Sequence, residues 1–169
     1  MTPVKSLMTL LVTLVMAAGA VGPSGPAAPD QASLRWSWPL SPKPDVLRIF
    51  DPPDKPWLSG HRGVDLGPVS DDGKVTAPSD GVVTFAGVVV DRPVLTIDHG
   101  DGLKSSFEPV TSELKAGDTV RKGQNIGSME PGHCSSATCL HWGVRRGEVY
   151  VNPLGFVEDL RPSILLPLH

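Results

Sequence analysis

Between Gly60 and Pro153 the sequence consists of short β-branched runs separated by turn residues, and its apolar residues follow no sustained helical period. The clearest runs are GVVTFAGVVV at 81–90 and VLTIDH at 94–99, with Asp91-Arg92-Pro93 as a turn between them. Such runs are typical of strands joined by tight turns. We expect further strands at 103–110, ended by Pro109, and at 119–129, 140–146 and 148–151, the last two as a hairpin. The sequence therefore predicts an all-β domain built on an antiparallel sheet.

The length and the net charge of the chain limit the number of its domains and the classes of partner that it can bind. The chain has 169 residues, which is the length of one domain or of one domain and a tail. Its 18 acidic and 15 basic residues give a net charge of -3, without the basic surface that nucleic acid requires. We expect a monomer that binds no nucleic acid. Because positive charge can be concentrated in one part of the surface, the net charge does not exclude a negatively charged polymer as the substrate.

The first twenty residues have the composition of a signal peptide. Lys5 supplies a positive charge, residues 6–17 form an almost uncharged apolar run, and Ala18-Gly19-Ala20 has the small residues of a cleavage site. If the chain is cleaved there, the mature protein starts at Val21. The sequence therefore predicts a secreted protein that is extracellular or associated with the cell wall and does not stay in the membrane. The alternative is a retained membrane anchor, which needs about 20 apolar residues and thus more than this run contains.

The rest of the chain divides into three parts. Residues 21–33 have no apolar period and predict a flexible linker, residues 34–157 form the expected domain, and residues 158–169 are a short tail interrupted by proline. The domain opens with an irregular strap, rich in Trp and Pro, that we expect to cross the sheet with Trp36 and Trp38 as anchors. We interpret these two rings as core side chains; a ligand-stacking role is the alternative.

The chain has two cysteines, Cys134 and Cys139, with four residues between them. An even number of cysteines in an exported protein predicts a disulfide. Because the closed loop is small, the chain-entropy model gives only about 2 kcal/mol of stabilisation. We therefore expect the bond to act locally, by fixing one loop.

His61 and Asp65 lie four residues apart in the segment GHRGVDLG. Side chains alternate between the two faces of a strand, so these two share a face while Val64 and Leu66 point to the core. Gly63 leaves room for a ligand between the two polar side chains. An imidazole and a carboxylate that face one point form half of a metal site. A surface ion pair or a turn contact is the alternative explanation.

A third candidate ligand, His141, lies in the segment CLHW, where its two neighbours are apolar. Taken alone, such a histidine is equally explained as a hydrogen-bonded core residue. Three protein ligands with an open fourth position are the pattern of catalytic zinc, which lowers the pKa of bound water to about 7. His141 is therefore a candidate third ligand that would complete such a zinc site with His61 and Asp65.

Four segments resemble, in the same order, segments of the lysostaphin and LytM type zinc metallopeptidases. GHRGVDL at 60–66 resembles their H-x-G-x-D motif, and CLHW at 139–142 stands where they carry H-x-H followed by an aromatic residue. VTAPSDGVV at 75–83 and GDTVRKGQNIG at 117–127 resemble turns of their scaffold. The resemblance implies an antiparallel sheet with a groove, of the duplicated-hybrid-motif type. It also implies one Zn2+ per chain, held by His61, Asp65 and His141, and peptidoglycan peptides as substrates.

Two positions depart from the family's pattern. The family carries two further histidines near the metal, and this chain has Pro109 and Cys139 in their place. We predict that two other residues act as catalytic groups instead: His133, brought to the metal by the disulfide at Cys134, and Glu108, as a base. The alternatives are an exposed loop histidine and a plain surface carboxylate.

These observations predict a secreted zinc metalloendopeptidase that cleaves peptidoglycan cross-links through zinc-activated water. The alternative is a catalytically degenerate domain that binds cell wall or regulates an amidase, since both helper histidines are replaced. A biotinyl or lipoyl carrier domain shares part of the V-x-A-P and G-D-x-V pattern. Such a domain needs a lysine, usually beside methionine, at a hairpin tip, and no Met-Lys or Lys-Met pair occurs in this chain. His99 is expected in a hairpin turn, bonded to the backbone.

Overall fold

The computed structural model of the chain describes residues 36–55, 57–69, 72–135 and 138–158. The predicted signal peptide, the predicted linker and all but the first residue of the predicted tail lie outside these residues. Among the described residues no helix is long and apolar enough to cross a membrane.

The described residues form eleven strands and one helical turn, α1 (Leu154–Val157). The strands are β1 (Val46–Arg48), β2 (Val64–Leu66), β3 (Lys74–Thr76), β4 (Gly81–Val89), β5 (Arg92–Gly100), β6 (Leu103–Glu108), β7 (Val110–Thr111), β8 (Thr119–Val120), β9 (Asn125–Met129), β10 (Leu140–Arg146) and β11 (Val149–Val151).

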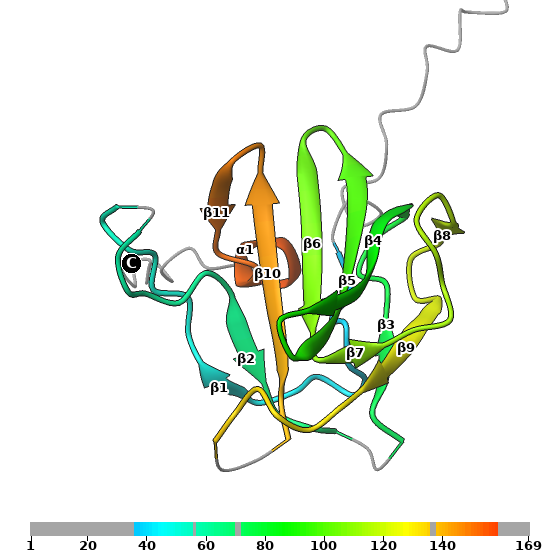
Figure 1. Cartoon of the computed structure of the whole chain (residues 1–169), viewed down its shortest axis with the longest axis horizontal. Coiled ribbons are helices and arrows are strands. Elements are labelled where there is room, and N and C mark those ends of the chain that lie inside the picture. Colours follow the sequence, from blue (N-terminus) through cyan, green and yellow to red (C-terminus); the bar gives the residue numbers. More distant parts are fainter. Residues whose placement is uncertain (1–35, 56, 70–71, 136–137, 159–169) are drawn as a thin grey trace, which may run out of the picture.

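The strands form two sheets in which every pair is antiparallel (Figure 1). The larger sheet has the order β1-β2-β10-β6-β5-β4-β8, with β11 paired to β10, and the smaller sheet has the order β3-β9-β7. The predicted all-β antiparallel architecture is therefore confirmed. Strand β10 lies between β2 and β6, so two motifs that are far apart in the sequence are neighbours in the sheet.

Side chains from both sheets fill one hydrophobic core. Leu95 and Ile97 of β5 are fully buried while the residues between and after them are partly exposed, as expected for a strand with one face toward the core. Phe107 of β6 and Trp142 of β10 are the largest fully buried side chains. Truncation of such an aromatic residue to alanine typically costs about 3–5 kcal/mol, so these strands form a rigid support for the site.

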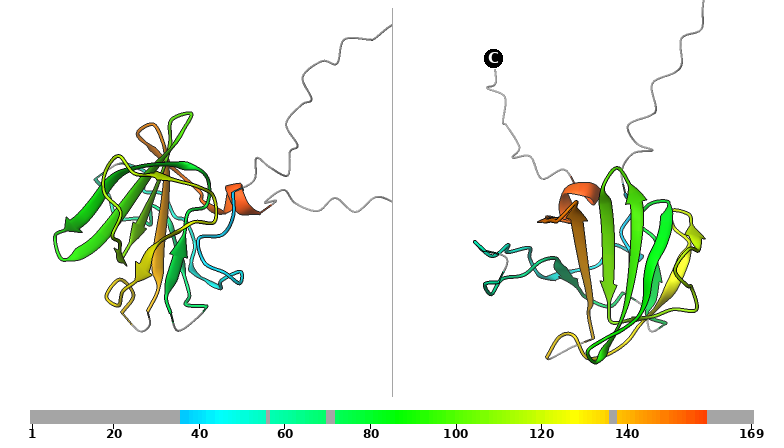
Figure 2. Two further views of the ribbon diagram at one scale, coloured as in Figure 1. Left: turned by 90° about the vertical axis from the view of Figure 1, so that its right-hand side faces the viewer. Right: turned by 45° about the horizontal axis from the view of Figure 1, so that its top comes forward.

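The Trp-rich strap is anchored as predicted. Trp36 is 9% exposed and its ring stacks on Phe156 at a centroid distance of 4.5 Å. Its backbone N–H donates to the carbonyl of Phe156, so the strap lies against α1 (Figure 2). Trp38 is partly buried and packs on the same core. The stacking of Trp36 on Phe156 thus joins the beginning and the end of the described domain.

Three local predictions were inaccurate. Arg92 and Pro93 belong to β5 rather than to the turn, because Val90, with a φ of 59°, makes the turn one residue earlier. The predicted strand at 119–129 divides into β8 and β9. By contrast, the strand predicted from Leu103 does end at Pro109, which has no N–H to donate to a ladder, and the separate strand β7 follows it. His99 lies within β5 rather than in a turn, although its Nδ1 does bond to the backbone carbonyl of Asp80.

Candidate metal centre

Strand pairing brings the two candidate motifs together. In the antiparallel register of β2 and β10, Asp65 lies directly opposite His141. Val64 and Leu66 are fully buried in the core, so the intervening Asp65 points to the other face. His61 precedes β2 and is held by an isolated bridge to Asp51. The alternation predicted from the sequence therefore places His61, Asp65 and His141 on one side of the sheet.

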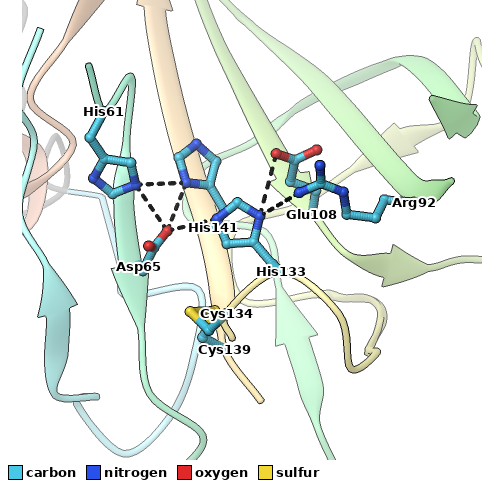
Figure 3. The surroundings of a disulfide bond; sticks show 8 residues. All are labelled: His61, Asp65, Arg92, Glu108, His133, Cys134, Cys139 and His141. Atoms are coloured by element: carbon cyan, nitrogen blue, oxygen red, sulfur yellow. Dashed lines mark hydrogen bonds and ion pairs between the residues drawn. A yellow bond between two sulfur atoms is a disulfide. The ribbon is translucent and has the colours of Figure 1, made fainter. Parts of the chain in front are cut away.

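The three predicted ligands meet at one point (Figure 3). His61 Nε2 lies 3.0 Å from Asp65 Oδ1 and 3.1 Å from His141 Nδ1, and His141 Nδ1 lies 2.8 Å from Asp65 Oδ1. His61 and Asp65 are each only 4% exposed. An isolated surface ion pair, the alternative for the His61 and Asp65 pair, does not describe this buried arrangement.

A hydrogen bond at the outer nitrogen of His61, Nδ1, determines whether the nitrogen that faces the cluster, Nε2, carries a proton or a lone pair. His61 Nδ1 lies 2.7 Å from the carbonyl oxygen of Ile49. A carbonyl only accepts, so Nδ1 carries the proton and donates it, and Nε2 of the neutral ring keeps its lone pair. That lone pair faces a carboxylate oxygen of Asp65. Two acceptors at 3.0 Å need a cation between them or a second proton on the ring.

Gly63 makes room for His141, as predicted. A Cβ at this position would lie 2.4 Å from the carbonyl oxygen of Trp142 and 2.7 Å from Nε2 of His141. Real Cβ atoms essentially never approach other atoms so closely. Any larger residue therefore displaces either the strand or the imidazole ring.

His133 is brought into the same cluster from the loop after β9. Its Nε2 lies 3.1 Å from Asp65 Oδ1, and the adjacent Cys134 forms the predicted disulfide with Cys139, at the start of β10. The ligand atoms of His61, Asp65, His133 and His141 all lie within 4.8 Å of one another. His133 is therefore not a solvated loop histidine but the fourth member of the cluster.

Arg92 controls the proton on His133. Its guanidinium lies 2.9 Å from His133 Nδ1 (Figure 3). A guanidinium only donates, so Nδ1 accepts and Nε2 of the neutral ring carries the proton. His133 therefore donates to Asp65, whereas His61 offers a lone pair. The two histidines differ in chemical role because their outer nitrogens have different partners.

Glu108 lies beside His133 and outside the four-residue cluster. Its Oε1 is 3.8 Å from His133 Nδ1, on the side that also faces Arg92 (Figure 3). The two positions at which the resembling family carries helper histidines offer no such group here. Pro109 is a buried proline, and Cys139 is fully buried in the disulfide. Within the described residues, His133 is thus the histidine that joins the two candidate ligands, His61 and His141, in the cluster.

The surroundings of Asp65 keep it ionised. Burial favours the protonated form of its carboxyl, but hydrogen bonds from His133 and His141 and the nearby His61 outweigh burial and hold the pKa of Asp65 well below its usual range. An ionised carboxylate is the form that binds a metal.

The donor set fits zinc. Two imidazoles and one carboxylate are common zinc ligands, and tetrahedral bonds of about 2.0–2.1 Å separate ligand atoms by roughly 3.3 Å. The three atoms of His61, Asp65 and His141 are 2.8–3.1 Å apart, within a few tenths of an ångström of that spacing. The Ile49 carbonyl supplies the outer hydrogen bond that typically orients a metal-binding histidine.

A pocket of about 460 Å3 opens beside the cluster. The three histidines of the cluster line it together with apolar or aromatic side chains, Val89, Val94 and Tyr150, and with four charged ones, Arg48, Arg62, Arg92 and Glu108. The predicted groove is therefore present next to the candidate ligands. His99 lies elsewhere, with its ring bonded to Asp80 and Ser105 and packed against Trp36.

Sequence reasoning missed Arg92 and Arg48. Arg92 was placed in a turn, and nothing in the local pattern indicates that it reaches a histidine 41 residues away. Arg48 is the register partner of Asp65 across β1 and β2, a pairing that includes an irregularity. Neither contact has a local signal, because both depend on which strands become neighbours.

Comparison with known proteins agrees with this architecture. The model of peptidase family M23 matches residues 59–153, which is more than half of the chain. The uncharacterized protein Rv2891 of Mycobacterium tuberculosis and Mb2915 of Mycobacterium bovis are each 41% identical over 141 residues, 79% of this chain. The aligned part is 55% of each relative, so the chain spans about half the length of these curated relatives.

Solved structures with the same fold include members of different function. SpoIIQ, from the SpoIIQ–SpoIIIAH pore-forming complex, has a TM-score of 0.63 at 24% identity, covering 75% of this chain and 92% of that one. The catalytic domain of lysostaphin from Staphylococcus simulans has a TM-score of 0.55 at 23% identity, covering 67% and 91%. Helicobacter pylori Csd3 has a TM-score of 0.56 at 26% identity, covering 73% and 36%. With the family match over residues 59–153, these findings show that the chain belongs to peptidase family M23.

Proposed function

We propose that this chain is an exported zinc metalloendopeptidase that cleaves the peptide cross-links of peptidoglycan. The observation that carries the proposal is the meeting of His61 Nε2, Asp65 Oδ1 and His141 Nδ1 beside an open pocket. Zinc held by these residues would polarise a peptide carbonyl and lower the pKa of water to about 7, which is the chemistry that the proposed cleavage needs. Membership of family M23 supports the peptidase reading.

The chain's own residues supply orientation and a hydrogen-bond donor. The Ile49 carbonyl fixes the His61 ring, and the opposed positions of Asp65 and His141 in β2 and β10 fix the other two ligands. His133 carries its proton on Nε2, directed at the cluster. With a peptide in the pocket, that N–H is placed to donate to the oxygen on which negative charge develops. Removal of one such donor in other enzymes costs roughly two to three orders of magnitude in rate.

Export to the cell surface is part of the same proposal. The apolar segment at 6–17 and the small residues Ala18-Gly19-Ala20 have the composition of a cleaved signal peptide. A disulfide between Cys134 and Cys139 suits an oxidising compartment. N-terminal sequencing of the protein recovered outside the cell should begin at or near Val21. Recovery of an intact Met1 from the membrane fraction would contradict export.

The metal assignment is tested by zinc stoichiometry. We expect one zinc per chain in the wild type and none in His141→Ala, because two remaining ligands leave the metal weakly held. His99→Gln is the matched control, since its ring bonds to Asp80 and Ser105 outside the cluster. Loss of zinc in His99→Gln with retention in His141→Ala would show that the site has been misplaced.

A second function is favoured by the two substituted positions. Pro109 and the disulfide-bonded Cys139 stand where the family's helper histidines are expected, which favours a domain that binds wall peptides, or regulates an amidase, without cutting. SpoIIQ, which shares the fold, is known from a complex with SpoIIIAH. Zinc-loaded protein that binds purified walls but releases no muropeptides on long incubation would favour this function over the peptidase.

A further inference from the structure

The pocket beside the cluster has an excess of positive charge that the rest of the chain does not share. Arg48, Arg62 and Arg92 line it, against a single acidic side chain in the lining, Glu108. The whole chain has the opposite balance, with a net charge of -3. Because a recessed site concentrates its local field, this pocket attracts anionic groups.

Arg48 is placed beside the cluster by strand pairing. Its Cα is the register partner of Asp65, and its side chain is exposed at the pocket. Within the part of the chain that the structure describes, its guanidinium makes no hydrogen bond or ion pair. A guanidinium presents donors in a planar fork that matches both oxygens of a carboxylate.

Arg62 lines the same pocket from the residue next to His61. One of its terminal nitrogens donates to the carbonyl oxygen of Leu58, 3.2 Å away, which orients the guanidinium. Arg92 donates to His133 and is 3.3 Å from Asp91, so its position is tied to the cluster. Arg48 therefore supplies the guanidinium best suited to a substrate carboxylate, and Arg62 adds a second positive charge at the same pocket.

We propose that the pocket selects peptides with a free carboxylate near the scissile bond, and that Arg48 and Arg62 bind this carboxylate. The proposal deepens the proposed function and rests on it for cleavage, although the binding itself needs no turnover. A neutral bridge of glycines offers the two arginines no anionic partner. A cross-link whose residues keep a free carboxyl group beside the bond offers one, and conversion of that group to a carboxamide removes the charge while retaining the shape.

The test compares cross-linked wall peptides with the same peptides after amidation of their carboxyl groups. Both are titrated calorimetrically into the full chain in the presence of a chelator, so that binding is measured without hydrolysis. We expect the acid form to bind about tenfold more tightly than the amide, since hydrogen bonds to charged groups are stronger than those to neutral ones. The preference should decrease as salt is added.

Substitution then assigns the preference to the two arginines. Arg48→Gln/Arg62→Gln should bind both peptides equally, with an unchanged circular dichroism spectrum. Arg146→Gln is the matched control, because Arg146 is exposed at the end of β10 and outside the pocket, and it should keep the preference. Equal affinity of the wild type for acid and amide, or an intact preference in the double variant, would overturn the proposal. Selective binding of the acid without cleavage of either peptide would support it while contradicting the proposed function.

Discussion

His133 Nε2 lies 3.1 Å from Oδ1 of Asp65, although 68 residues separate the two in the sequence. The contact is made possible by the loop that the Cys134–Cys139 disulfide closes, and by Arg92 on the opposite nitrogen of the ring. It places a hydrogen-bond donor where the family's usual helper histidines are missing. The proposed activity would therefore depend on a residue outside the family's metal-binding motifs.

Replacement of His133 should separate rate from metal binding. We expect His133→Ala to lower kcat/KM by at least about tenfold, or 1.4 kcal/mol of transition-state stabilisation. Zinc content should stay at one per chain, because the three ligands are unchanged. Ser135→Ala, at an exposed position of the same loop, is the control and should match the wild type in both measurements. Loss of zinc from His133→Ala would instead identify His133 as a fourth ligand.

The fit of the His141 ring against Gly63 predicts a strong effect of one methyl group. Gly63→Ala places its Cβ 2.7 Å from His141 Nε2, so the ring or the strand must shift. We expect zinc affinity, measured by competition with a chelating dye, to decrease by about tenfold or more, the loss typical of a displaced ligand. Gly67→Ala is the matched control, since its nearest neighbours are 3.6 Å away. Equal affinities of the two variants would show that the ring tolerates the methyl group.

Removal of the disulfide should impair the enzyme through His133 alone. Cys134→Ser/Cys139→Ala releases the loop that carries His133, while alanine keeps the buried position 139 apolar. We expect a rate close to that of His133→Ala, zinc still bound, and no further loss when both changes are combined. A double variant with full activity would mean that the loop holds its shape without the bond. Additive losses would mean that the disulfide acts on another part of the site.

The partly buried His99 gives stability a dependence on pH. Burial lowers the pKa of His99, and its hydrogen bond to Asp80 offsets this only in part. The folded protein then binds fewer protons than the unfolded chain below the ordinary pKa of about 6.5. The free energy of unfolding is therefore unaffected well above that pH and decreases as the pH falls from 7 toward 5.

Urea titrations at several pH values test this dependence. His99→Gln keeps one donor and one acceptor for Asp80 and Ser105 but has no proton to bind. The decrease in unfolding free energy between pH 7 and pH 5 should be smaller in this variant than in the wild type. The other titrating groups are common to both proteins and cancel in the comparison. Identical slopes would show that His99 is accessible to protons in the folded state.

The sequence predicted those features that depend on local pattern. Alternation in GHRGVDLG placed His61 and Asp65 on one face, because the period of a strand is fixed by its geometry. Short β-branched runs predicted the antiparallel sheet, and family resemblance connected His141 to the other two ligands. Pro109 was predicted to end the strand that begins at Leu103, and it does, because proline in a strand is itself a local signal.

Other features depend on tertiary neighbours and could not be read from the pattern. The proton on His133 is fixed by Arg92, which reaches it across 41 residues. The charge of the pocket depends on the register of β1 against β2, which brings Arg48 beside Asp65. A local sequence window contains neither the strand order nor this register. The position of His133 and the positive charge of the pocket, on which both proposals rest, are therefore properties of the assembled sheet.

The most direct test of the account is cleavage of purified peptidoglycan by the zinc-loaded chain. Wild-type protein with one zinc per chain should release new amino termini from cross-linked walls, and the chelated protein and His141→Ala should release none. Mass spectrometry of the released muropeptides should show hydrolysis of a peptide bond in the cross-link. Zinc-loaded wild type that binds the walls and generates no new amino termini would contradict the central claim that this M23 domain is a peptidase.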